Sequence, residues 1–483
     1  MTETATAWET VIGLEVHAEL RTQTKLFCGC RNSFGEEPNV NVCPVCLGLP
    51  GSLPVLNRTA VEYAMRIGTA LHCRVQPSIF HRKNYFYPDM PKDYQISQYD
   101  IPINAEGWLD LPGGRRVRIE RAHMEEDTGK STHVGGGGRI HEATYSLVDY
   151  NRAGVPLVEI VSAPDMRGAE EARAYVDELR AILVATGASD GKMEEGSLRV
   201  DANVSVRPNG RGEFGTRCEI KNMNSLRSLG RAIEYEAARQ VALVTEGGRV
   251  AQETRHWDEG AGRTGSMRSK EEAYDYRYFP EPDLVAVEPS DEWIASVAAA
   301  IPRLPAERRA ALAGASGLAA ESDAVVTVVR LGLDGFADAV ITSGGGEHAT
   351  AVAVRRLANE VAAEIGSVAR LTPRAFCRLV AMESDGSLTP AQARTVLKAL
   401  LDSGGEPDDI AAGLGFAAME AGDLEAVVDQ VISAYPDEWA RLVAGEGKLT
   451  GFFIGHIKEA TDGNADLKAA SVLLRARSAQ SGA

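Results

Sequence analysis

Every second residue from Ile12 to Leu20, close to the start of the chain, is apolar. The apolar positions are Ile12, Leu14, Val16, Ala18 and Leu20, and the polar positions include Glu15, His17 and Glu19. Successive side chains of a β-strand point to opposite faces, so this period of two predicts a strand with one buried and one polar face. A charged outer face is common in antiparallel sheets, and this strand alone therefore indicates no particular chemistry.

Three further segments extend this pattern. Residues 198–207 and 217–221 alternate in the same way, and the glycine-rich segment between them predicts a hairpin. Their polar faces carry Arg199, Asp201, Asn203, Ser205, Arg207, Arg217, Glu219 and Lys221. Residues 158–161 place Glu159 among apolar residues, where an unpaired charge is costly, so a cation or a basic partner is expected beside it. We predict four strands that direct these groups at one concave face, a ligand set suited to Mg²⁺ and nucleotide phosphates.

Helical spacing dominates elsewhere. It predicts helices within residues 57–73, 168–186 and 225–246, and it continues to the end of the chain after Pro289, where Ala, Leu, Val and Glu become frequent. A Gly-Gly-Glu-Pro segment at 404–407 interrupts the helical pattern. The sequence therefore predicts an α+β protein in three parts. These are a cradle domain with an antiparallel sheet (residues 1–290), a helical domain (291–407) and a helical tail domain (408–483).

Composition and charge limit the functional classes. The chain has 483 residues, of which 44% are hydrophobic and 25% charged, and the N-terminus lacks the basic and apolar regions of a signal peptide. We expect a cytoplasmic protein that does not enter a membrane. The formal net charge of −17 argues against nonspecific binding to nucleic acid. Residues 441–483 carry six Lys and Arg against four Asp and Glu, so any RNA contact is expected to be local and in this tail.

Four of the seven cysteines are concentrated in one short segment. Cys28 and Cys30 form a C-x-C motif, and after twelve intervening residues Cys43 and Cys46 form a C-x-x-C motif. This spacing predicts a tetrahedral zinc site made of four thiolates, with no open position for catalysis. The other cysteines (Cys73, Cys218 and Cys377) are expected in the core, and His81, His123, His133 and His141 are weaker metal candidates.

Two loops carry further polar groups. Residues 82–94 interleave aromatic residues with Lys83 and Lys92, and two prolines predict a structured loop, which either packs on its own tyrosines or stacks on bases. Glu125 and Glu126 lie at the end of a predicted strand. A shift of strand parity in residues 117–124 indicates a bulge, so spacing does not decide which of the two acids faces the other carboxylates. A glycine run at 135–138 predicts a hairpin tip.

These segments resemble the B-subunit family of the aspartyl/glutamyl-tRNA(Asn/Gln) amidotransferases (the GatB family) nearly from end to end. The matching segments are residues 12–20, 28–46, 82–95, 125–133, 149–164, 192–206, 218–225, 275–284 and 451–473. The resemblance implies a cradle like that of glutamine synthetase and guanidino kinases, then a helical domain and a YqeY-like tail that binds tRNA. It also implies that ATP and Mg²⁺ phosphorylate the side-chain carboxylate of Glu-tRNA(Gln) or Asp-tRNA(Asn), which ammonia then converts to the amide. A separate amidase (glutaminase) would supply the ammonia, in a heterotrimer completed by the family's small third component.

The resemblance also assigns roles to particular residues. The implied Mg²⁺ ligands and catalytic residues are Glu15, His17, Glu125 and Glu159, with Glu126 as the substitute for Glu125. The implied ATP-binding or substrate-binding residues are Asp201, Asn203, Glu219, Lys221 and Arg199. Lys83, Lys92 and Glu125 would line a channel for ammonia, and Cys28, Cys30, Cys43 and Cys46 would hold structural Zn²⁺.

Two other functions remain open. The first is a non-catalytic, zinc-containing adaptor that binds tRNA, in which the acidic strand faces only form salt bridges. The second is the archaeal-type paralogue specific for Glu-tRNA(Gln), which should contain an inserted domain. The composition of residues 290–410 shows no break where such a domain would begin, which disfavours this second alternative.

Overall fold

The computed structural model describes residues 8–135, 143–210, 212–267, 276–342, 346–362, 368–416, 421–461, 465 and 467–481. The chain divides into two compact units, Met1–Pro305 and Ala306–Ala483. Most of the glycine run at 135–138 lies outside the described residues, as does His141. The division into three domains with boundaries at residues 290 and 407 stays a prediction.

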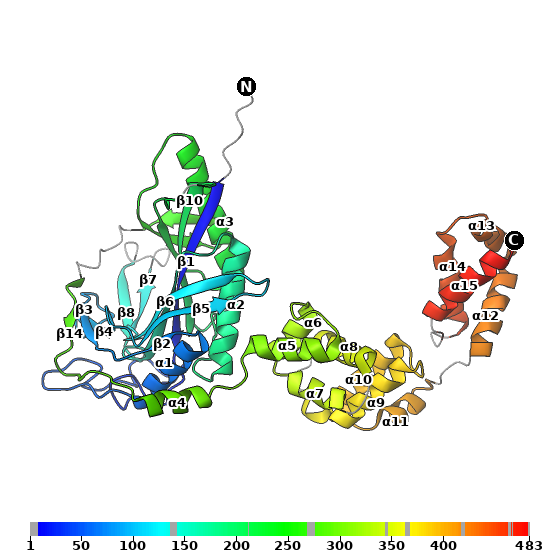
Figure 1. The fold of residues 1–483 in the computed structure, drawn as a ribbon, viewed down its shortest axis with the longest axis horizontal. Helices are drawn as coiled ribbons and strands as arrows, with labels where there is room; N and C mark the ends of the chain where they lie inside the picture. Colours follow the sequence, from blue (N-terminus) through cyan, green and yellow to red (C-terminus); the bar gives the residue numbers. More distant parts are fainter. Residues whose placement is uncertain are drawn as a thin grey trace. The chain divides into compact units, whose positions relative to one another are not determined.

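A large mixed sheet dominates the first unit (Figure 1). Its strands are β1 (Trp8–Glu19), β2 (Arg74–Val75), β3 (His81–Asn84), β4 (Tyr94–Ser97), β5 (Asn104–Asp110), β6 (Arg116–Glu126), β9 (Pro156–Ser162), β10 (Leu198–Pro208), β11 (Cys218–Lys221), β12 (Thr254–Asp258), β13 (Arg263–Ser266) and β14 (Phe279–Pro280). The order along the main path is β13-β12-β11-β10-β1-β9-β6-β4-β3-β14, and β5 joins β2 to β6. Only β11 and β12 pair in parallel among these described strands. A separate hairpin consists of β7 (Lys130–Val134) and β8 (Tyr145–Asp149).

Strand β1 lies near the centre of this sheet, between β9 and β10. Leu14, Val16 and Ala18 are buried, whereas Glu15 and His17 remain partly exposed, which confirms the alternation predicted from the sequence. The hairpin of β10 and β11 is confirmed as well, because these strands pair antiparallel. The four predicted carboxylate-bearing strands are therefore consecutive in the sheet, in the order β11-β10-β1-β9.

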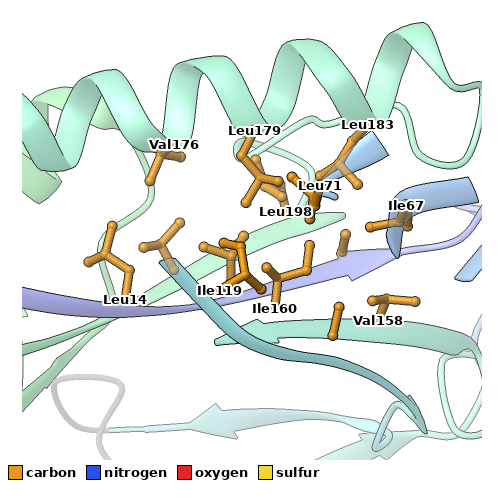
Figure 2. Close-up of a cluster of buried hydrophobic side chains, with 14 of the residues drawn as sticks. Leu14, Ile67, Leu71, Ile119, Val158, Ile160, Val176, Leu179, Leu183 and Leu198 are labelled. Carbon is orange, nitrogen blue, oxygen red and sulfur yellow. The ribbon is translucent and has the colours of Figure 1, made fainter. Parts of the chain in front are cut away.

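Three helices cover the apolar face of the sheet. They are α1 (Arg58–Ala70), α2 (Ala169–Ala185) and α3 (Leu226–Thr245), at the positions that helical spacing predicts. Figure 2 shows Val176, Leu179 and Leu183 of α2 pointing at Leu14, Ile119 and Ile160 of the strands below. This core fixes the apolar face, so the opposite face of the same strands is left for polar groups. Helix α4 (Asp291–Ala299) completes the unit and contacts α1 through Trp293, whose Nε1 donates to Glu62.

Every described element of the second unit is a helix. These helices are α5 (Pro305–Ser316), α6 (Asp323–Arg330), α7 (Asp334–Thr342), α8 (Gly346–Arg356), the π-helix η2 (Leu357–Val361), α9 (Pro373–Ser384), α10 (Pro390–Ser403), α11 (Pro407–Gly413), α12 (Ala421–Ala434), α13 (Pro436–Val443), α14 (Leu449–Ala460) and α15 (Leu467–Ser481). They enclose two hydrophobic cores, one between Leu312 and Ala411 and the other between Leu424 and Leu474. The predicted α+β class is thus confirmed. No helix in the described part of the chain has the length and apolar character needed to cross a bilayer.

The prediction of a continuous loop at residues 82–94 is partly wrong. Arg82, Lys83 and Asn84 belong to β3, and Tyr94 begins β4, so only the intervening residues form a loop. The prolines lie within this loop, where their missing N–H groups do not interrupt the pairing of β3 with β4.

We expect that Leu179→Ala lowers the free energy of unfolding of the first unit by about 2–5 kcal/mol, since it removes a fully buried side chain between α2 and the sheet. Urea unfolding followed by circular dichroism measures the change. Val184→Ala, on the same helix but 50% exposed, is the control and should change the free energy by less than about 0.5 kcal/mol. Equal effects of the two substitutions would contradict this account of the core.

Candidate functional site

The polar face of the sheet lines a cavity of about 540 Å³. Strand register decides which side chains meet there. Glu159 of β9 is paired with His17 of β1 on one side and with His123 of β6 on the other. Glu15 of β1 is likewise paired with Asp201 of β10. Because paired residues on neighbouring strands point to the same face, polar side chains separated in sequence converge in one place.

His17, Glu125 and Glu159 form one cluster, which we call the first triad. The possible ligand atoms of the three residues all lie within 4.8 Å of one another. The His17 Nε2 atom is 3.5 Å from Glu159 Oε2 and 3.8 Å from Glu125 Oε1. Two carboxylates and one imidazole at this spacing could hold a divalent cation.

The two carboxylates of the first triad differ in their ionisation. Burial and then the charge of Glu159 raise the pKa of Glu125. Burial alone would raise the pKa of Glu159 too, but its contacts with His123 and His17 hold that pKa well below the ordinary value. Burial lowers the pKa of His17, yet the bond to Glu159 and the surrounding carboxylates outweigh it and raise this pKa to about 9. Glu159 is therefore the firmly ionised member of the triad, and Glu125 is the member that accepts a proton more readily.

His123, which the sequence indicated only as a weak metal candidate, is a residue of this site. Its Nε2 atom is 3.4 Å from Glu159, and its Nδ1 atom is buried without a hydrogen-bond partner among the described residues. Burial lowers the pKa of His123 to about 4, so this imidazole is neutral at neutral pH. The available sequence signal was its position two residues before Glu125, which places both side chains on the same face of β6.

Glu15, Asp201 and Glu219 form the second triad, again with possible ligand atoms within 4.8 Å of one another. Neighbouring side chains hold these carboxylates in place. Asn203 Nδ2 donates to Glu15 Oε1 over 2.9 Å, and Thr254 Oγ1 donates to Glu219 over 2.8 Å. The structure therefore brings Glu15 together with Asp201 and Glu219, while His17, Glu125 and Glu159 gather in the first triad.

Glu126 faces away from both triads. Its carboxylate pairs with the Lys92 ammonium and accepts the backbone N–H of Ile96, and both charged side chains are nearly completely buried. The register of β6 shifts between Ile119 and Arg121, at the bulge that the parity of the sequence indicated. Beyond that shift, Glu125 points into the cavity and Glu126 to the other side of the strand. Lys92 therefore lies apart from Lys83. Lys83 lines the cavity on the polar face of the sheet, which we call the main cavity.

Cationic side chains line the cavity on both sides of the carboxylates. Lys83 of β3 and Arg121 of β6 are on one side. On the other side are Arg217, just before β11, and Lys221, the last residue of β11. Arg199 is absent from this lining, because its guanidinium forms two hydrogen bonds, of 2.6 and 3.2 Å, with Asp127. The arrangement of carboxylates between cations suits a cation-bound polyphosphate, whose charges need both kinds of partner.

The four thiols of Cys28, Cys30, Cys43 and Cys46 converge in the segment between β1 and α1. Their sulfur atoms lie within 4.8 Å of one another, and none forms a disulfide. The Cys43 N–H donates to the Cys46 sulfur over 3.1 Å. This geometry could hold one tetrahedral zinc ion.

Lys25 provides an independent test of whether zinc fits these residues. Its side chain is fully buried beside the thiols, and its Nζ donates to the carbonyl oxygens of Asn41 (2.8 Å) and Tyr150 (3.2 Å). No ion pair joins Lys25 to a carboxylate of the described residues. A buried ammonium without counter-charge is costly, and four thiolates around one zinc ion carry a net charge of about −2. The zinc site would therefore supply the negative charge that Lys25 lacks.

We expect that Lys25→Met lowers the zinc affinity of the chain about 10- to 100-fold, the range for losing a partner of a metal's ligands. Competition with a zinc-chelating dye measures the affinity. Lys130→Met, at an exposed position on β7, is the control and should leave it unchanged. Equal zinc affinity in the Lys25 variant and the wild type would show that this charge does not stabilise the thiolate cluster.

Comparison with known proteins adds a family relationship to this geometry. The family described as "GatB/GatE catalytic domain" matches residues 10–295, and the one described as "GatB domain" matches residues 334–477. The chain is 49% identical to the B subunit of the aspartyl/glutamyl-tRNA(Asn/Gln) amidotransferase of Frankia casuarinae, over 97% of this chain and 95% of that protein. It is 48% identical to the corresponding proteins of Carboxydothermus hydrogenoformans, over 97% of this chain and 98% of that protein, and of Mycobacterium tuberculosis, over 96% and 93%.

Proposed function

The chain belongs to the B-subunit family of the aspartyl/glutamyl-tRNA(Asn/Gln) amidotransferases, and from this premise we propose that it activates the aminoacyl group of a misacylated tRNA with ATP. The acceptor is the side-chain carboxylate of Glu-tRNA(Gln), Asp-tRNA(Asn) or both. The observation that supports the proposal best is the convergence of two carboxylate triads and four cationic side chains in one cavity.

The chemistry explains why activation comes before amidation. A carboxylate resists attack by ammonia because it is anionic and has no good leaving group. Transfer of the γ-phosphoryl group breaks the bond between that group and ADP and forms an acyl phosphate on the carboxylate. Ammonia then attacks the acyl carbon, and inorganic phosphate leaves with the bonding electrons. The products are ADP, phosphate and the amide on the tRNA.

Different residues of the cavity would have different roles in this reaction. Each triad would hold Mg²⁺, which when bound neutralises charge on the phosphate oxygens. Lys83 lies beside Glu125 and Glu159, where its ammonium can neutralise the incoming carboxylate. Arg217 and Lys221, beside the second triad, are placed to neutralise the polyphosphate. Asn203 orients Glu15 through the hydrogen bond between their side chains.

The rest of the assembly completes the proposal. A partner glutaminase supplies ammonia, and a small third component completes a heterotrimer in the cytoplasm. Ammonia would pass Lys92, which lies on the other side of β6, before it reaches Lys83 and Glu125 in the cavity. The first unit is a cradle of the glutamine synthetase and guanidino kinase type, with zinc as a structural ion, and the C-terminal YqeY-like helices bind the tRNA.

We expect that Glu15→Gln reduces metal-dependent ATP turnover about 10²- to 10³-fold. The affinity for tRNA should stay within a few-fold of the wild-type value. The change removes a carboxylate charge from the second triad and no contact with tRNA phosphates. Phosphate release by the assembled complex, with and without misacylated tRNA, measures turnover, and filter binding measures affinity. Glu234→Gln is the matched control, because this exposed residue of α3 lies on the helix-covered side of the sheet.

Parallel loss of binding and turnover in Glu15→Gln would refute the ligand assignment. The competing function is a zinc-containing adaptor that binds tRNA without catalysis. Metal-dependent turnover of ATP that requires misacylated tRNA would exclude the adaptor, whereas binding of tRNA with no such turnover would support it.

The tail yields a separate prediction. Helices α12 to α15 have their own hydrophobic core, and Lys448, Lys458 and Arg475 belong to residues 441–483, where six Lys and Arg exceed four Asp and Glu. We expect that removal of all residues after Phe416 weakens tRNA binding about tenfold or more, because phosphate contacts dominate such affinities. ATP turnover per bound tRNA should change less than twofold to threefold. Unchanged tRNA affinity in the truncated complex would contradict the role given to the tail.

A further inference from the structure

Tyr99 and Tyr278 lie in the lining of the main cavity, with their rings packed face to face. Their rings are stacked, with centroids 4.1 Å apart and an angle of 9° between the planes. Tyr99 follows β4, and Tyr278 immediately precedes β14. Because β3 pairs with both β4 and β14, the sheet itself holds the two rings together.

Core packing does not account for this pair. Neither tyrosine belongs to the hydrophobic clusters of the described residues, and the side chain of Tyr99 is 45% exposed. Burial raises the pKa of Tyr278 to about 12, so its phenol stays neutral at physiological pH. Tyr278 covers one face of the Tyr99 ring, so the opposite face of this partly exposed ring is the one suited to a flat ring of a ligand. A nucleobase gains dispersion and hydrophobic free energy by stacking on such a face.

The surroundings of the pair give the position of such a ligand. Tyr276 packs edge to face against Tyr278, with centroids 6.1 Å apart, and the Lys83 Nζ lies 4.6 Å from the centre of the Tyr276 ring. Lys83 in turn interacts with Glu125 of the first triad. A ligand whose base stacks at the tyrosines can therefore present an anionic group to Lys83, next to the triad.

Two substrates of the proposed reaction carry a purine, namely ATP and the 3′-terminal nucleotide of the tRNA. The part of the cavity next to β11 suits ATP better than the part next to the tyrosines. Arg217 and Lys221 lie there beside the second triad, and Arg217 also lines an adjoining cavity of about 500 Å³ that contains the exposed Phe214. Each end of the cavity carries two cations, but the adjoining cavity gives a triphosphate further room beside Arg217. At the tyrosine end, Lys83 lies against the Tyr276 ring, where it can match a single carboxylate.

We propose that Tyr99, supported from behind by Tyr278, is the stacking surface for the 3′-terminal base of the misacylated tRNA. The proposal rests on the proposed function and adds the site at which the acceptor is recognised. The terminal base would fix the end of the tRNA so that its aminoacyl carboxylate lies between Lys83 and the first triad. ATP would approach from the side of Arg217, and the two reacting groups would meet between the triads.

The test combines a protein change with a change in the tRNA. The probes are tRNA(Gln) molecules that carry glutamate through a stable amide and have either adenine or no base at the 3′ nucleotide. We expect Tyr99→Ala to raise the dissociation constant of the adenine-containing tRNA about tenfold in the assembled complex. Tyr99→Phe, which retains the ring, should restore the wild-type value. Removal of the base should weaken binding to the wild type similarly and cause no further loss in Tyr99→Ala.

ATP affinity and a distant tyrosine provide the controls. ATP binding should be unchanged in Tyr99→Ala, which also shows that the cavity has kept its fold. Tyr145→Ala, at an exposed position on β8 outside the main cavity, should bind both tRNAs as the wild type does. A selective loss of ATP affinity would overturn the proposal and give the surface to the base of ATP. Equal loss for tRNAs with and without the terminal base would also overturn it. These binding measurements need no turnover, so failure of the proposed reaction would appear separately, as absent tRNA-dependent phosphate release by the wild type.

Discussion

The antiparallel pairing of β1 with β9 and β10 is the constraint on which the rest of the cavity depends. It sets His17 opposite Glu159 and Glu15 opposite Asp201, so that each triad receives residues from strands distant in sequence. A slip of one residue would turn these side chains to the other face and bury them under α2. The register is resistant to such a slip because Leu14 and Val16 would then leave the core. Packing on one face thereby fixes the chemistry on the other.

Concentrating this many carboxylates in one cavity has an electrostatic cost. The row of Glu15, Glu125, Glu159, Asp201 and Glu219 lies on neighbouring strands, where like charges repel. Lys83 and Lys221 offset part of this repulsion, and divalent cations would offset more. Lys25 presents the reverse case, a buried ammonium placed beside four thiols. In the cavity, bound Mg²⁺ would offset the repulsion between carboxylates. At the thiols, bound zinc would give the thiolates the net negative charge that Lys25 needs. Metal binding and stability are therefore coupled at both sites.

Local patterns predicted the parts of this structure that depend on neighbouring residues. The alternation around Leu14 predicted β1, the glycine-rich segment predicted the β10–β11 hairpin, and the spacing of Cys28 to Cys46 predicted the convergence of the thiols. Features that depend on distant partners were not predictable. Spacing did not decide between Glu125 and Glu126, because the answer depends on a bulge several residues earlier in β6.

The residues whose roles changed show the same limit. His123 stood alone in the sequence, and only its pairing with Glu159 of β9 brings it to the triad. Arg199 lies on the expected face of β10, yet Asp127 from the loop after β6 engages its guanidinium. The division of six acidic and imidazole groups into two triads likewise required the register of five strands. Sequence patterns indicate which residues face a cavity, and pairing between strands decides which of them meet.

The most direct test of the account is to follow the γ-phosphate of labelled ATP with the assembled complex and Mg²⁺. Glu-tRNA(Gln) and Asp-tRNA(Asn) would be supplied in turn, first without a source of ammonia. The account predicts that label appears in an acyl phosphate on one or both tRNAs and is released as inorganic phosphate, with formation of the amide, when glutamine is added. Amide formation without any label passing through the aminoacyl group, or no turnover that depends on the tRNA, would contradict it.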